Sequence, residues 1–80
     1  MKFLRPHEVA HKMGLSKASL YRLVKGGMFP RPVKIFANVS VWLDSEVEQI
    51  MSAMYRNSPP DEIRELVRSI ERSRTKGPDS

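Results

Sequence analysis

Basic and hydroxyl-bearing side chains are concentrated in residues 16–25 of this sequence. If the apolar residues of this segment, Leu20, Leu23 and Val24, face a protein core, the opposite face of the segment is polar and basic. The other side chains are Ser16, Lys17, Ala18, Ser19, Tyr21, Arg22 and Lys25. Lysine and arginine bind phosphate oxygens, and arginine and serine also hydrogen-bond to base edges. The chemistry that this face favours is therefore the binding of an anionic polymer.

The distribution of charge along the 80 residues supports the same chemistry. The net charge is +5, but residues 1–40 hold eight Lys or Arg and one Glu, which gives +7. Residues 41–80 hold six basic and eight acidic side chains, which gives −2. Positive charge confined to one half is typical of a nucleic-acid-binding surface, although a solvated basic face kept for solubility would look the same.

Few residues are suited to catalysis or to metal binding. His7 and His11 are spaced to share one face of a helix, but there is no cysteine and only Glu8 is nearby to complete a metal site. Asp44, Glu46 and Glu48 occupy alternate positions of a predicted helix, so their side chains point apart and do not form a catalytic pair. We therefore predict that the protein is not an enzyme and that it holds no metal or cofactor.

Two short helices must position the basic segment. Pro6 suits the first turn of a helix over residues 6–13, and Gly14 suits its end. Ser16 is a plausible N-cap for a second helix that ends near Lys25, before Gly26. Two such helices joined by a tight turn form a helix-turn-helix.

Packing the apolar faces of the two helices together leaves a defined set of side chains pointing outward. Because a helix fits the major groove of B-DNA, Lys17, Ala18 and Ser19 are expected to approach base edges. Arg22 could contact a base or a phosphate. Tyr21 and Lys25 are expected to contact the DNA backbone.

A β-hairpin is predicted after the second helix. Residues 33–36 and 39–42 are rich in β-branched and aromatic side chains, and Ala37-Asn38 connects them, with Asn able to adopt positive φ. As a wing, this hairpin would lay Lys34 and its tip at Asn38 along a phosphate backbone, with Arg31 as a further phosphate contact. The aromatic residues Phe3, Phe29 and Trp42 could stack on single-stranded bases, but we expect them in the core.

Two more helices are expected. Ser45 and Glu48 form a capping-box pattern for a helix that ends near Tyr55, with Asp44 as a competing cap. The next helix, over residues 61–74, carries the apolar stripe Ile63, Leu66, Val67 and Ile70. This stripe must either fold back onto the domain or pair with a second copy. We expect it to mediate oligomerisation.

The predicted architecture is mostly α with a small β-hairpin: a winged helix-turn-helix DNA-binding domain plus an extra C-terminal helix. The boundaries are residues 1–55 for the winged domain, 56–60 for a linker, 61–74 for the C-terminal amphipathic helix and 75–80 for a flexible tail. The sequence has no apolar run long enough for a signal peptide or a membrane span. With no cysteines, this predicts a cytoplasmic protein.

The sequence also resembles the AlpA family of small prophage regulators, relatives of the MerR-like winged-helix excisionases. The resemblance covers roughly residues 3–54, in the runs FLRPHEVAHKMGLSKASLYRLVKGGMFPRPVKI and VWLDSEVEQI. Its most specific parts are GLSKASLYRL, GMFPRPVK and the tryptophan followed by Ser-Glu-Val. The wing tip departs from the family, with Phe36-Ala37-Asn38 where a glycine-rich, arginine-bearing tip is usual.

The resemblance implies a DNA-binding protein of a prophage or other mobile element. Such a protein is a transcriptional regulator, an excisionase or both, and binds double-stranded DNA at a promoter or an attachment site. Integrase and RNA polymerase are the partners that this role implies, and binding as a homodimer or cooperative oligomer is expected. The resemblance assigns groove or phosphate contacts to Ser16, Lys17, Ser19, Tyr21, Arg22 and Lys34. The alternative is a protein–protein interaction module that uses the C-terminal helix and Phe36.

Overall fold

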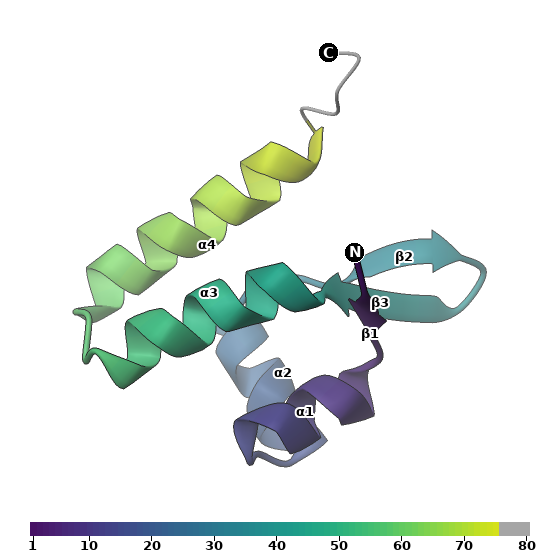
Figure 1. The fold of residues 1–80 in the computed structure, drawn as a ribbon, viewed down its shortest axis with the longest axis horizontal. Coiled ribbons are helices and arrows are strands. Elements are labelled where there is room, and N and C mark those ends of the chain that lie inside the picture. Colours follow the sequence, from purple (N-terminus) through teal and green to yellow (C-terminus); the bar gives the residue numbers. More distant parts are fainter. Residues whose placement is uncertain (76–80) are drawn as a thin grey trace.

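The computed structural model describes residues 1–75, which form four helices and a small antiparallel sheet (Figure 1). The elements are β1 (Phe3–Leu4), α1 (Pro6–Met13), α2 (Lys17–Lys25), β2 (Val33–Phe36), β3 (Val39–Leu43), α3 (Asp44–Tyr55) and α4 (Pro60–Thr75). The predicted mostly helical fold with a wing and an extra C-terminal helix is confirmed. Apart from Thr75, the predicted tail lies outside the described residues.

Local signals define the helix-turn-helix as the sequence predicts. Pro6 begins α1, and the Glu8 carboxylate accepts a hydrogen bond of 2.7 Å from the Arg5 backbone N–H. Gly14 ends α1 with φ of 72°, a left-handed conformation in which glycine has no Cβ to clash. The hydroxyl of Ser16 then accepts from the Ser19 N–H at 3.1 Å and caps α2. The tight turn therefore fixes where α2 starts and how it leaves α1.

The hairpin projects from the helices as a wing and belongs to a larger sheet than the sequence suggested (Figure 1). β3 pairs with β2 on one side and with β1 on the other, where Leu4 lies opposite Trp42. The expected turn geometry is corrected in one respect. Ala37, with φ of 44°, adopts the positive φ that we expected of Asn38, and the register between β2 and β3 shifts next to it.

The start of α3 corrects a second expectation. Leu43 occupies the N-cap position, and no side chain caps the helix, so neither the predicted capping box nor the competing Asp44 cap forms. Instead, the carboxylates of Asp44 and Glu48 both bind the Lys12 ammonium, at 2.6 and 2.5 Å. These ion pairs attach α3 to α1.

The chain turns back after α3 ends at Tyr55, and α4 then runs alongside α3 (Figure 1). Ile63, Val67 and Ile70 are only 4–5% exposed, and Leu66 packs against the same core while partly buried. The chain thus covers its own apolar stripe, which is the fold-back arrangement of the two that the sequence left open, and oligomerisation through this stripe stays a prediction. The interaction-module alternative depended on the same stripe, so its main surface is also buried.

The core is centred on two aromatic side chains. Trp42 and Phe29 are almost fully buried, with ring centroids 5.7 Å apart, as expected for core residues. The Trp42 indole N–H donates to the carbonyl of Pro30 at 2.7 Å. Phe3, which we also expected inside, is half exposed because β1 lies at the edge of the sheet. Within residues 1–75, no helix combines the length and apolar character needed to span a membrane.

Candidate nucleic-acid interface

The outward face of α2 presents basic side chains that the rest of the protein does not use. Lys17, Arg22 and Lys25 are exposed, and none of them forms a side-chain hydrogen bond or ion pair with any part of the described chain. Ala18 is also exposed and adds no bulk near the start of the helix. This face can therefore donate to an external anion without first breaking an internal contact.

Apolar contacts on the opposite side hold α2 in place. Leu20 is fully buried, and Leu23 and Val24 pack against the core while partly buried. Tyr21, which is 39% exposed, has its ring centroid 6.1 Å from that of Trp42. The Tyr21 ring is thus placed against the core and its outer part remains accessible.

The two serines at the start of α2 are tied to each other. The Ser16 hydroxyl donates to the Ser19 hydroxyl at 3.1 Å, in addition to capping the helix. Ser16 is exposed and Ser19 is partly buried. Both hydroxyls therefore have a structural role, and their use as DNA contacts stays a prediction.

The wing carries an unpaired cation next to exposed apolar side chains. Lys34 lies opposite Ser40 in the sheet, is exposed, and forms no ion pair within residues 1–75. Ala37 and Asn38 are exposed at the tip, and Phe36 is 66% exposed beside them. Lys34 and the tip are accessible, as a phosphate contact would require.

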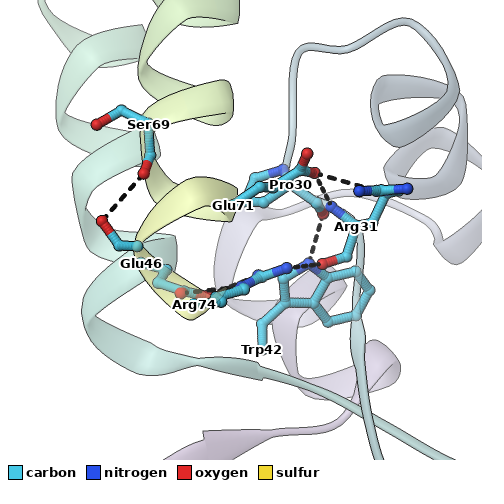
Figure 2. Close-up of polar contacts among 8 residues, drawn as sticks. Pro30, Arg31, Trp42, Glu46, Ser69, Glu71 and Arg74 are labelled. Atoms are coloured by element: carbon cyan, nitrogen blue, oxygen red, sulfur yellow. Dashed lines mark hydrogen bonds and ion pairs between the residues drawn. The ribbon is translucent and has the colours of Figure 1, made fainter. Parts of the chain in front are cut away.

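Arg31 lies at the base of the wing, where α4 holds it. Its backbone N–H donates to the Glu71 carboxylate at 2.9 Å, and its Nε lies 3.5 Å from the same oxygen. The Arg31 carbonyl accepts a 2.7 Å hydrogen bond from Arg74, which also binds Glu46 (Figure 2). Sequence reasoning missed this network, because its partners are separated by 28 to 43 positions.

Lys12 shows how differently a basic residue behaves away from this face. A hydrogen bond to Asp44, and to a smaller extent one to Glu48, holds the pKa of the Lys12 ammonium above its usual value of 10.5. Two carboxylates thus bind Lys12, whereas Lys17, Arg22, Lys25 and Lys34 have no acidic partner within residues 1–75. The exposed cations on α2 and β2 are therefore available to an external anion.

The structure offers no metal-binding cluster in the part of the chain that it describes. His7 and His11 are both exposed, and no group of three or more His, Cys, Asp or Glu side chains comes together within residues 1–75. The predicted absence of an enzymatic function stays a prediction.

Comparison with known proteins places this geometry in a biological context. Residues 2–55 match the family described as "Prophage CP4-57 regulatory protein (AlpA)". The "Uncharacterized protein ORF88" of Enterobacteria phage P4 is 41% identical over 51 residues, which cover 64% of this chain and 58% of the relative. The matched segment is thus shorter than two thirds of that relative. No solved structure matches the chain.

Proposed function

Because the chain belongs to the AlpA family of prophage regulatory proteins, we propose that it binds double-stranded DNA through the outward face of α2. The observation that carries this proposal is the set of exposed, unpaired cations on α2, with the helix held from behind by Leu20. A helix presented in this way fits the major groove.

The residues of α2 divide by their position along the helix. Lys17, Ala18 and Ser19, in the first turn, face base edges, while Arg22 contacts a guanine or a phosphate. Lys25 at the end of α2 contacts the DNA backbone. On this arrangement, phosphate neutralisation provides most of the affinity and a few side chains near the helix start provide sequence preference.

A single α2 contacts too few base pairs to find one site in a genome, so we propose that binding is cooperative or dimeric. Ile63, Val67 and Ile70 are buried within the single chain, so we propose that copies contact one another through another surface. As a regulator the protein would act at a promoter with RNA polymerase, and as an excisionase it would bend an attachment site used by an integrase.

Substitution of Arg22 tests the proposed interface. Arg22→Ala should weaken specific binding by about 1 to 3 kcal/mol, because a direct hydrogen-bonded contact is lost. The thermal unfolding midpoint should hardly change, since the side chain is exposed. The measurement is a mobility-shift titration with the promoter and attachment-site DNA of the element, set beside random DNA of equal length.

Arg72→Ala is the matched control, since it removes the same charge from an exposed position on α4. It should leave DNA affinity close to that of the wild type. Equal binding by wild type and Arg22→Ala would contradict the assignment of the α2 face. Absence of any DNA binding by the folded wild-type protein would overturn the proposed function itself.

A further inference from the structure

A basic cleft lies between the C-terminal end of α2 and the helix α4. Its volume is about 200 Å³, and Lys25, Arg31, Arg64 and Arg68 contribute to its walls. Glu71 is the one acidic residue in the lining. Four cations and one carboxylate line the cleft, so its lining carries a net positive charge. Arg64 and Arg68 lie outside the segment that matches the family, so the family match assigns them no role.

Carboxylates lie within ion-pair distance of three of these cations, and Lys25 is left without an acidic partner in the described chain. Glu71 is committed to Arg31, through the backbone N–H and Nε. Outside the lining, Glu65 binds Arg68 at 2.8 Å, while Asp61 lies 3.8 Å from a terminal nitrogen of Arg64, beyond hydrogen-bond distance. The ammonium of Lys25 has no partner within the described chain.

Arg64 is placed against α2 by main-chain contacts. Its Nε donates to the carbonyl of Gly26 at 3.2 Å, and its side chain lies over Gly27, where a Cβ would be 3.8 Å from the Arg64 Cδ. Only the Nε is used in this contact. The terminal nitrogens of the guanidinium are therefore held beside the end of α2 with their N–H groups available, and a guanidinium fork matches two phosphate oxygens.

The position of the cleft relative to α2 indicates which phosphate it could reach. The nine residues of α2 span about 13 Å at ~1.5 Å per residue. The major groove is about 12 Å wide. If the first turn of α2 faces base edges, Lys25 and Gly26 therefore lie at the edge of the groove, where the sugar–phosphate backbone runs. Because Lys25 belongs to both the α2 face and the cleft, the two surfaces are continuous.

We propose that this cleft binds one backbone phosphate of the duplex that α2 contacts, so that α4 is part of the DNA-binding surface. Lys25 and the guanidinium groups of Arg64 and Arg68 donate to the phosphate oxygens, while Glu71 keeps Arg31 in the wall of the cleft. The inference rests on the proposed function and extends it to a helix outside the family segment. A phosphate contact of this kind adds affinity without sequence preference.

The test compares Arg64→Gln/Arg68→Gln with the wild type in salt titrations of DNA binding. Because Lys25 remains, the slope of log K against log salt should become shallower by up to about 0.9, and complete loss of the contact would be about an eightfold loss of affinity at 0.1 M salt. The loss should be the same for the natural site and for random DNA. Arg72→Gln is the control, since Arg72 also binds Glu65 but does not line the cleft.

A duplex series with one uncharged methylphosphonate at each position identifies the phosphate concerned. At one position near the edge of the site, neutralisation should weaken the wild type more than the double variant, which keeps only Lys25 as a donor to that phosphate. Arg68→Gln alone serves if the double variant fails to fold, because its ion pair with Glu65 lies within α4. The single variant should show a smaller change in the same direction.

The outcomes separate this inference from the proposed function. If Arg22→Ala weakens binding while the cleft variants keep the wild-type slope and the same methylphosphonate profile, the cleft does not bind DNA and the α2 interface stands. If the wild type binds neither natural nor random DNA, the proposed function fails and this inference falls with it. A loss confined to the natural site would assign the arginines to base contacts and overturn the phosphate role.

Discussion

Arg74 donates to both carboxylate oxygens of Glu46, 28 positions earlier in the chain, at 3.1 and 2.7 Å. A further N–H of the same guanidinium donates to the carbonyl of Arg31 at 2.7 Å. The two side chains are only 19% and 11% exposed. One arginine near the end of α4 therefore connects α3 with the loop that leads from α2 into the wing (Figure 2).

Loss of this arginine should destabilise the fold. Arg74→Gln leaves the buried carboxylate of Glu46 without its charged partner, and hydrogen bonds to charged groups contribute about 1.5 to 3 kcal/mol. We expect the free energy of unfolding, measured by urea titration, to fall by about that amount. Arg72→Gln, at an exposed position on the same helix, should have a much smaller effect. Similar losses for both variants would contradict the importance of the Glu46 contact.

The apolar stripe of α4 should stabilise each single chain. Ile70 is 5% exposed in the core, so Ile70→Ala should lower the free energy of unfolding by about 2 to 5 kcal/mol through lost burial and a cavity. Because the contact is within one chain, the wild-type unfolding midpoint should not depend on protein concentration. A midpoint that rises with concentration would indicate that the stripe pairs between copies instead.

The ion pairs of Lys12 should make stability depend on alkaline pH. The hydrogen bond to Asp44 raises the pKa of folded Lys12 above 10.5, so the folded state holds this proton more tightly than the unfolded state. The contribution to stability is complete below pH 10.5 and declines as pH rises through the folded-state pKa.

This dependence is measured as the difference between the melting temperatures of wild type and Lys12→Gln. The difference should be largest below pH 10.5 and should shrink as the pH rises through the folded-state pKa of Lys12. Other groups titrate in both proteins, so their effects on the melting temperature cancel in this difference. A difference that stays constant across this range would show that the ammonium charge of Lys12 does not stabilise the fold.

The wing should contribute to DNA affinity without contributing to sequence preference. Lys34 is exposed and unpaired within the described chain, so Lys34→Ala should make the salt slope shallower by about 0.9, from an expected total of about −3 to −5 per protomer. The ratio of specific to random binding should stay the same. A changed ratio in competition titrations would place Lys34 on a base edge instead.

Local signals explain how much of the fold could be predicted. Pro6, Gly14 and Ser16 act on their immediate neighbours, so the bounds of α1 and α2 follow from residue types alone. The two strands of the wing were predicted for the same reason. β1 was missed because two residues have no periodicity of their own and pair with a strand about 40 positions later.

The position of α4 could not be deduced from its pattern. The spacing of Ile63, Val67 and Ile70 shows that one face needs to be buried, but a fold-back and a dimer satisfy that need equally well. The same limit applies to the candidate interface. Helical periodicity predicted which side chains of α2 point outward, whereas the contact of Arg64 with Gly26 brings together residues 38 positions apart.

The scaffold holds α2 without using the side chains that would face DNA. Leu20 on the inner side and the main-chain carbonyl of Gly26 provide the attachments, while Lys17, Ala18 and Arg22 contact no side chain through a hydrogen bond or ion pair in residues 1–75. Exchanging these three outward residues for others should therefore leave folding intact. A set of variants randomised at these positions would offer new target sequences on an unchanged frame, which makes this small domain a starting point for selecting altered DNA specificity.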